Sequence, residues 1–418
     1  MVLAFDMNTH SGNILKPTTA VRTFIRGRQF EHPIRPGRIA SSHQTRLTMN
    51  RLFLFLLAGF VLIGSSVHAQ DSGAEAILNV LAERPHDVSL VVYSLDDPES
   101  GLYHNANVMR PLATTIKILV LAEYARRVAD GMLDPEELVS LDSVETYYFT
   151  GTDRGAHVLA VAALRNAGQL ENDELTLAEI AEAMIRFNDN AAADYLMLRF
   201  GREAMDALPE RLDLLYAEPP VPISGIYLTW DTVYTTEDDP AISYDQPDDR
   251  AWMFSRSLRA GENFSDGAGE WMMGESPRMS YGALASAALS FPTGSARAYA
   301  GLMARVFRGE LISEQVSEIM LDILDYEMDD PGIQVQFDQL LATRSGSLAG
   351  ILTGAYAADL KPQYVDGHDP PPTVVALFVE NLTDDVFDQL MSTTLLDFGM
   401  SLLNDPEFVD LTRERLGE

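Results

Sequence analysis

The chain contains no cysteine and few basic residues. Its 418 residues include 30 Lys and Arg against 62 Asp and Glu, which gives a formal net charge of −32. Without cysteine, structural disulfides and a lipid anchor on an N-terminal cysteine are both excluded. The acidic excess argues against nucleic acid and anionic membrane surfaces as partners, because both repel a protein of their own sign.

The N-terminal apolar run, Leu52 to Ile63, is too short to cross a bilayer comfortably. It follows the basic residue Arg51 and precedes the small-residue pattern Val-His-Ala that ends at Ala69. This order is typical of an export signal. We therefore predict a signal peptide over residues 49–69, a periplasmic or secreted protein, and no stable membrane anchor.

The segment before Met49 is difficult to reconcile with an export signal, which should begin the protein. Residues 1–48 are basic, punctuated by Pro and Gly, and without periodicity. We interpret them as an over-extended start, with Met49 as the initiator; the alternative is a disordered extension before a membrane anchor. The remaining residues, 70–418, are expected to form the functional domain.

Strand and helix patterns are separated along residues 70–418. Alternating apolar residues predict strands near both ends, over 88–93, 102–108, 335–342, 348–357 and 373–380. Helical periodicity and capping signals predict helices over 74–82, 115–130, 176–187, 191–200, 295–307, 313–326 and 384–403. This order predicts an α+β fold, with one antiparallel sheet built from both chain ends and an inserted helical lobe.

Residues 230–277 fit neither pattern. They carry the acidic clusters Asp238-Asp239 and Asp248-Asp249, several glycines and several prolines. We interpret them as an insertion or lid with a solvated surface. The alternative is a cation bound by the acidic clusters, but the carboxylates lack the spacing of a cation-binding loop, so we expect no metal there.

The most informative stretch is the one around Thr114 and Lys117, at the start of a helix that is apolar on most of its circumference. The spacing i, i+3 places the hydroxyl and the amine on one face, within hydrogen-bonding reach. Burial would lower the lysine pKa, so that the amine can accept the hydroxyl proton. The alternative is an N-cap threonine beside a lysine whose ammonium reaches solvent.

Two further stretches add to this pair. Asn188-Asp189-Asn190 interrupts a helical pattern, where backbone and amide groups can point into a cleft. Arg344-Ser345-Gly346-Ser347 lies between two strand patterns and offers a cation, hydroxyls and a glycine that lets a ligand approach the backbone. A helix cap and a hairpin turn are the structural alternatives.

With these three stretches in this order, the chain resembles the penicillin-recognising serine hydrolases, that is, class A β-lactamases and penicillin-binding relatives. Their signature is Ser-x-x-Lys, Ser-Asp-Asn and Lys-Thr-Gly. Here it reads Thr114-Thr115-Ile116-Lys117, Asn188-Asp189-Asn190 and Arg344-Ser345-Gly346. The resemblance runs from about Val88 to the C-terminus, apart from 230–277, and implies a β-lactamase/transpeptidase-like fold.

The resemblance also implies a role for each matching residue. Thr114 would be the nucleophile that accepts the acyl group, and Lys117 its base. Asn190 would hold a substrate amide, and Arg344 with Ser345 and Gly346 the substrate carboxylate. The N–H groups of Thr114 and Ser347 would form the oxyanion hole.

The chain departs from the family pattern at three places. Threonine replaces the nucleophilic serine, and its extra methyl restricts χ1. Asn188 replaces a serine that passes a proton to the leaving nitrogen, and an amide relays protons poorly. The family's deacylating glutamate has no counterpart in residues 219–225, where Glu218 is the nearest candidate.

Three functions remain open from the sequence. The first is an exported β-lactamase-like acyl hydrolase acting on a β-lactam or a related amide or ester through Thr114. The second is a hydrolase of a non-lactam ester or cell-wall peptide. The third is a catalytically impaired binding protein with the same cleft. A small-molecule substrate is expected in each, and no cofactor or metal, because acyl transfer of this kind needs none.

Overall fold

A computed structural model describes residues 67–149, 152–170, 172–230, 247–259, 281–343, 345–362, 371–392 and 395–418. The predicted N-terminal extension and most of the predicted signal peptide lie outside these residues. The first described helix, α1 (Val67–Ala82), contains the predicted cleavage site at Ala69. No described helix is both long and apolar enough to span a membrane.

The central sheet is antiparallel and combines strands from both ends of the chain. Its order is β2-β1-β10-β9-β7, and β8 also pairs with β9. The register of β1 with β10 runs from Val88 opposite Val379 to Ser94 opposite Thr373. The strands are β1 (Val88–Ser94), β2 (Leu102–His104), β7 (Phe337–Ala342), β8 (Gly346–Leu348), β9 (Ile351–Leu360) and β10 (Thr373–Val379).

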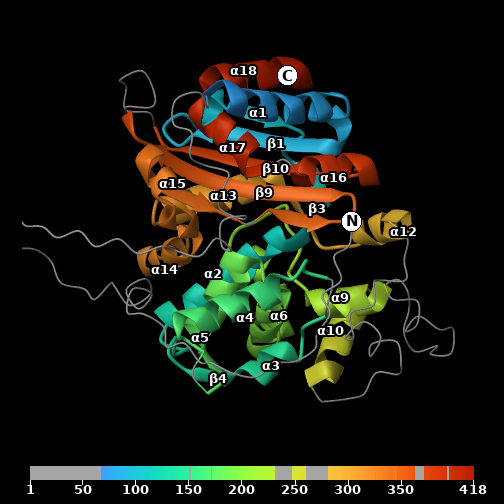
Figure 1. Cartoon of the computed structure of the whole chain (residues 1–418), viewed down its shortest axis with the longest axis vertical. Helices are drawn as coiled ribbons and strands as arrows, with labels where there is room; N and C mark the ends of the chain where they lie inside the picture. Colours follow the sequence, from blue (N-terminus) through green and yellow to red (C-terminus); the bar gives the residue numbers. More distant parts are fainter. Residues whose placement is uncertain are drawn as a thin grey trace, which may run out of the picture.

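Helices cover both faces of this sheet (Figure 1). The outer layer contains α1 and the C-terminal helices, and α13 packs on the opposite face against β9 and β10. Strands buried on both faces are apolar at nearly every position, which explains the continuous apolar runs of β9 and β10. The helices of this part are α12 (Tyr281–Ala288), α13 (Ala296–Phe307), α14 (Glu314–Leu324), α15 (Pro331–Gln336), α16 (Asp384–Ser392), α17 (Leu395–Asn404) and α18 (Pro406–Leu416).

The middle of the chain forms a helical lobe on the other side of α13 (Figure 1). Two short ribbons accompany it, β3 (Met109–Pro111) with β6 (Thr293–Ser295), and β4 (Leu138–Ser140) with β5 (Glu174–Thr176). The lobe helices are α2 (Lys117–Ala129), α3 (Leu141–Glu145), α4 (Ala156–Ala167), α5 (Leu177–Glu182), α6 (Asn190–Phe200), α7 (Arg202–Asp206), α8 (Leu208–Arg211), α9 (Ile223–Trp230) and α10 (Pro247–Arg259). The predicted α+β architecture is confirmed.

Several predicted element boundaries were wrong. The strand expected over 348–357 is two strands, β8 and β9, because Gly350 has a φ of 77° and the chain turns there. Residues 335 and 336 belong to α15 rather than to β7, and the helix expected over 384–403 is two helices. Helices α4, α9 and α18 were not predicted.

The predicted insertion at 230–277 is partly helical. Its segment α10 packs on α9, and Gly225 permits this contact, since a Cβ there would lie 2.0 Å from the carbonyl oxygen of Ala251. The remainder of the insertion lies outside the described residues. The expectation of an irregular insertion was therefore wrong for α10. The acidic residues at its start masked the helical spacing of its apolar residues in the sequence.

Helix α2 is held in the lobe by a buried carboxylate. Glu123 is fully buried and accepts hydrogen bonds from Arg126, Arg127 and Arg211 at 2.7–2.9 Å. Burial acts to raise the pKa of this carboxyl, but the hydrogen bonds and charges of Arg126 and Arg127 outweigh it and lower the pKa. Glu123 therefore remains ionised inside the lobe.

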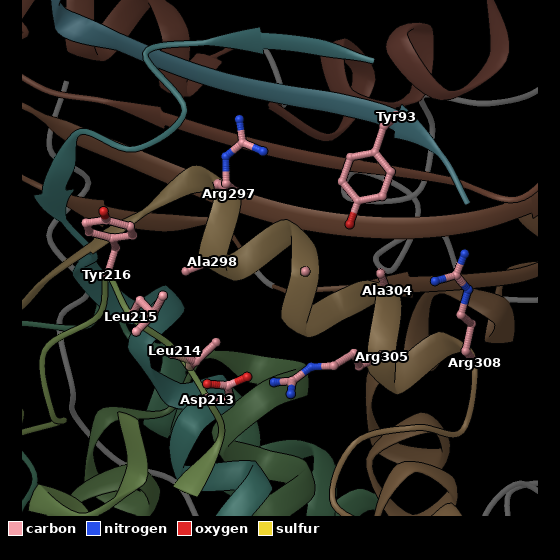
Figure 2. Close-up of a pocket in the computed structure, with 11 residues that line it drawn as sticks. Tyr93, Asp213, Leu214, Leu215, Tyr216, Arg297, Ala298, Ala304, Arg305 and Arg308 are labelled. Atoms are coloured by element: carbon pink, nitrogen blue, oxygen red, sulfur yellow. The ribbon is translucent and has the colours of Figure 1, made fainter. Parts of the chain in front are cut away.

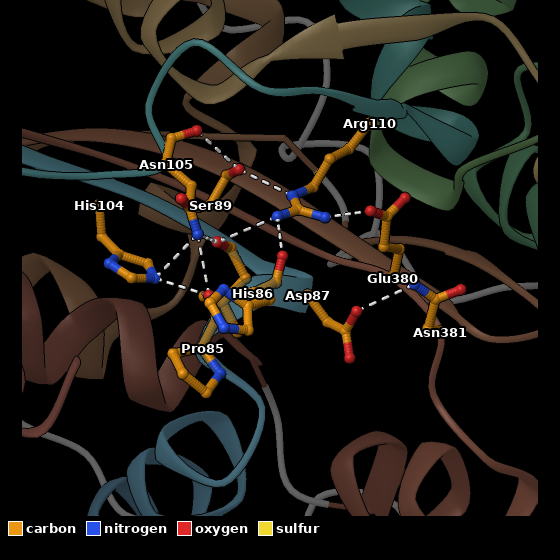
Figure 3. A network of polar contacts seen from close by, with 10 residues as sticks. Pro85, His86, Asp87, Ser89, His104, Asn105, Arg110, Glu380 and Asn381 are labelled. Carbon is orange, nitrogen blue, oxygen red and sulfur yellow. Dashed lines mark hydrogen bonds and ion pairs between the residues drawn. The ribbon is translucent and has the colours of Figure 1, made fainter. Parts of the chain in front are cut away.

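A second polar network holds the segment that leads into α2 (Figure 3). The buried guanidinium of Arg110 donates to Ser89 Oγ at 2.7 Å, to the carbonyl of His86 at 2.6 Å and to Glu380. These partners lie beside or within β1 and just after β10, so Arg110 ties the end of β3 to two sheet strands. The position of the following residues is thereby fixed against the sheet.

Candidate active site

Thr114 lies in a strained turn between β3 and α2. Ala113, directly before it, has a φ of 46°, a conformation that L-residues rarely adopt and that costs about 1–3 kcal/mol. Residues Ala113–Ile116 form a 3₁₀ turn that leads directly into α2. In such a turn residues i and i+3 lie one above the other, which stacks Thr114 on Lys117.

Hydroxyl groups connect this turn to the sheet. The Oγ1 of Thr353, on β9, donates to the carbonyl of Leu112 at 2.8 Å and lies 2.8 Å from Thr115 Oγ1. All of these groups are buried. The contacts hold the strained turn against β9 and offset part of the cost of its conformation.

Lys117 is buried at the first turn of α2. Its Nζ donates to the carbonyl oxygen of Asn188 at 2.6 Å and to the side-chain Oδ1 of Asn188 at 2.7 Å. Burial lowers the lysine pKa to about 7, although the carboxylates of Asp189, Asp153 and Asp194 act to raise it. A substantial fraction of the side chain is therefore neutral near pH 7 and able to accept a proton.

The Thr114 hydroxyl and the Lys117 amine, which we expected within hydrogen-bonding reach of each other, form no hydrogen bond in this structure. The Oγ1 of Thr114 is buried, and no partner for it exists among the described residues. Asn188 presents two oxygens to the Lys117 ammonium, which uses two of its three N–H donors there. One further N–H of an ammonium group remains for the hydroxyl on the same face.

The Asn188-Asp189-Asn190 stretch is a break between two helices, as predicted. A π-helical turn, Ala183–Phe187, ends at Asn188, whose φ of 63° is left-handed. The Asp189 side chain then caps α6 by accepting from the N–H groups of Ala191 and Ala192. π-helical turns are frequent at functional sites, and this one turns both oxygens of Asn188 towards Lys117.

Asn190 begins α6 with a side-chain oxygen that is buried and unpaired among the described residues. It is 6% exposed, and its Oδ1 has no hydrogen-bond partner among the described residues. Its Nδ2 lies 3.5 Å from the carbonyl of Thr152, at the margin of a hydrogen bond. Buried amides are normally paired, so the unpaired oxygen is suited to an external donor such as a substrate N–H.

The third stretch reaches the same place from the sheet. Gly346 and Ser347 lie on β8, which contacts the turn that carries Thr114. A Cβ at Gly346 would lie 2.3 Å from Thr353 Oγ1 and 2.9 Å from the backbone nitrogen of Thr115, so only glycine allows this approach. Ser345 Oγ lies 3.5 Å from the hydroxyl of Tyr356, and Arg344 lies outside the described residues.

The deacylation candidate Glu218 has a structural role. Its carboxylate accepts from the backbone N–H of Thr293 on β6 at 2.7 Å, and its own N–H donates to the Thr293 carbonyl. A different acid lies beside residues 219–225. Asp194 accepts from the N–H groups of Ile223 and Ser224 at 2.7 Å, and burial raises its pKa to about 6.

Sequence reasoning missed two further groups around the site. Asp153 caps α4 by accepting from the N–H of Gly155 and of His157, and its charge acts on Lys117. His157 lies on α4, 2.8 Å from Asp189. The pattern Asp-x-Gly before an apolar run was a detectable signal for the cap, whereas a single histidine in a helical pattern carries none.

A surface pocket of about 410 Å³ lies elsewhere, between β1, α13 and residues 213–216 (Figure 2). None of the predicted site residues lines it. Its arginines already have partners: Arg305 donates to the carbonyl of Leu212, Arg308 to that of Leu95, and Arg297 to Asn107 at 2.9 Å. We therefore assign these arginines a structural role. No group of three potential metal ligands occurs among the described residues.

The architecture and the site define the class of the protein. An antiparallel sheet from both chain ends, an inserted helical lobe and a hydroxyl–lysine pair at their junction form a β-lactamase/transpeptidase-like fold. The family model described as "Beta-lactamase enzyme family" matches residues 73–385. The chain belongs to this β-lactamase family.

Solved structures are similar at low sequence identity. A β-lactamase from Sphaerobacter thermophilus is 17% identical, with 83% of this chain and 97% of that one covered and a TM-score of 0.46. A β-lactamase from Chitinophaga pinensis is 13% identical, with 78% and 99% covered and a TM-score of 0.46. PBP-A is 16% identical, with 79% and 95% covered and a TM-score of 0.45. A search of curated proteins found no match.

Proposed function

We propose that the chain is an exported acyl hydrolase that opens a β-lactam, or a related amide or ester, through an acyl-enzyme at Thr114. The observation that carries the proposal is the buried Lys117, which has a lowered pKa and lies one turn from a hydroxyl without a partner. A base activates a nucleophile when its nitrogen comes within hydrogen-bonding reach of the hydroxyl, and the i, i+3 spacing of Thr114 and Lys117 suits this approach.

The chemical steps follow from these groups. Lys117 Nζ takes the proton of Thr114 Oγ1 as the oxygen attacks the carbonyl carbon, and the carbonyl oxygen becomes an oxyanion. The N–H groups of Thr114 and Ser347 are proposed to stabilise that oxyanion. The carbon–nitrogen bond then breaks, and the Lys117 ammonium returns its proton to the leaving nitrogen, because the amide of Asn188 cannot relay one.

Substrate placement is assigned to the remaining predicted residues. The unpaired Oδ1 of Asn190 would accept from a substrate amide. Arg344 and Ser345 would hold a carboxylate, Arg suiting a bidentate grip. Water then attacks the ester at Thr114. We expect this step to be slow, because Glu218 is hydrogen-bonded to β6 and Asp194 to the start of α9.

A second candidate is a binding protein with impaired chemistry. Two observations favour it: Thr114 Oγ1 makes no hydrogen bond to Lys117, and Asn188 occupies two donors of the ammonium. In that case the cleft would bind a β-lactam or a cell-wall-like peptide without forming an ester.

Intact-protein mass spectrometry after incubation with penicillin G separates the two candidates. We expect the wild type to gain the mass of one penicillin, located at Thr114, and Thr114→Ala to gain none. No adduct on the wild type, but one on Thr114→Ser, would indicate the binding protein. An adduct that persists in Thr114→Ala would refute Thr114 as the nucleophile.

A further inference from the structure

His157 is a buried histidine that faces a carboxylate from each ring nitrogen. It is 3% exposed, and its Nδ1 lies 2.8 Å from Asp189 Oδ2. Its Nε2 has no hydrogen-bond partner among the described residues, and Glu145 Oε1 lies 3.9 Å away on α3. Nothing in the proposed reaction uses this side chain.

The surroundings of His157 favour its charged form. Burial acts to lower the pKa of the imidazole, but the hydrogen bond and charge of Asp189 outweigh it, and Glu145 and Asp153 act in the same direction. The net effect raises the pKa above its ordinary value of 6.5. The ring of Tyr148 packs against the imidazole at 4.5 Å between centroids.

Asp189 connects this histidine to Lys117. It directly follows Asn188, whose two oxygens accept hydrogen bonds from the lysine. Of the three carboxylates that raise the pKa of Lys117, Asp189 has the largest effect. The other two charges come from Asp153 and Asp194. A positive charge hydrogen-bonded to Asp189 therefore cancels part of the strongest field that would keep Lys117 protonated.

We propose that His157 is a positioning residue that fixes Asp189 at the helix break and, by carrying a positive charge, keeps Lys117 available as a neutral base. The proposal rests on the role given above to Lys117. The pH range in which the site works is then set partly by a residue outside the substrate cleft.

The test measures the titration of Lys117 directly. The chain has three lysines, Lys16, Lys117 and Lys361, so a protein labelled with ¹³C at lysine Cε gives few signals. In His157→Asn the amide keeps a donor for Asp189 but removes the charge. We expect the Lys117 midpoint to rise by about one pH unit, as expected when a nearby charge is removed. A rise from about 7 to about 8 lowers the neutral fraction at pH 7 about fivefold.

His104→Asn is the matched control. His104, on the edge strand β2, is also buried, and its Nδ1 lies 2.7 Å from a carboxylate oxygen of Glu418. Both variants lose a buried histidine bonded to a carboxylate, so both are expected to lose stability. Only His157→Asn should move the Lys117 midpoint, and an unchanged midpoint in a folded His157→Asn protein overturns the proposal.

A wild-type measurement covers the case in which His157→Asn does not fold. The imidazole of His157, followed in protein labelled with ¹³C at histidine Cε1, should still be protonated at the midpoint of Lys117. An imidazole that is already neutral there has no charge to offset Asp189, which refutes the proposal without any variant.

Acylation separates this inference from the proposed function. The rate of penicillin G acylation against pH should shift its acidic limb upward in His157→Asn, with no shift in His104→Asn. If no adduct forms at any pH while the Lys117 midpoint still moves, the hydrolase proposal fails and the role of His157 stands. If adducts form and the midpoint is unmoved, the reverse holds.

Discussion

Replacing Lys117 by methionine should change how stability depends on pH. The folded pKa of about 7 lies below the ordinary value of 10.5, so between these values the unfolded chain binds more protons than the folded one. The stability of the wild type therefore rises with pH across this window, and the contribution is lost as pH falls towards 7. Lys117→Met keeps an unbranched side chain that is one heavy atom shorter, and it removes this dependence.

The expected magnitude follows from the two pKa values. The proton difference between unfolded and folded wild type rises from about one half at pH 7 to nearly one at pH 9, so the wild type gains about 2 kcal/mol over this range relative to Lys117→Met. The hydrogen bonds to Asn188 that the variant also loses shift the whole difference but not its slope. The carboxyl of Asp194, with a pKa of about 6, is ionised throughout.

Urea denaturation of both proteins at pH 7, 8 and 9 measures this difference. A difference in unfolding free energy that increases with pH supports a buried lysine that is half neutral at pH 7. A flat difference would mean that Lys117 titrates at its ordinary value. In that case only about one lysine in 3,000 would be neutral at pH 7, and Lys117 could not serve as an efficient base.

Two substitutions test the supports of the site. Gly346→Ala should lose about 1–3 kcal/mol of stability and most of the acylation, because the added methyl group would clash with Thr353 and Thr115. The control is Gly301→Ala, where an added Cβ would meet no atom within 4 Å. We expect this control to be neutral or slightly stabilising in thermal unfolding. Glu123→Gln should lower the free energy of unfolding by about 3–5 kcal/mol at pH 7, because three arginines lose the buried carboxylate with which they pair. The difference from wild type should shrink as pH falls through the lowered pKa of Glu123. A loss that is constant from pH 7 to the acid transition would contradict the assignment.

Local periodicity was sufficient for most of the fold. The short apolar runs at 88–93 and 373–380 predicted β1 and β10, and the capping box at Thr176 predicted the start of α5. The errors lie where tertiary contacts decide the local structure. The turn at Gly350 splits one apolar run into β8 and β9, and α10 is a helix because α9 provides a surface for it.

The candidate site divides in the same way. Residue type and spacing predicted that Thr114 and Lys117 share a face, and that the stretches at 188–190 and 344–347 belong to the same site. The partner of the ammonium was not predictable, because Asn188 lies 71 residues away and its left-handed backbone conformation depends on the π-helical turn. The contact between His157 and Asp189 likewise depends on how α4 packs.

The pairing of β1 with β10 has a consequence for synthesis of the protein. The two strands are about 290 residues apart in the sequence. The mostly apolar strand β1 is therefore synthesised long before its partner β10. At about 5–20 residues per second that interval lasts roughly 15–60 s. During it β1 lacks the strand that covers one of its edges in the folded protein, so this segment is exposed to non-native pairing until the C-terminal part of the chain is made.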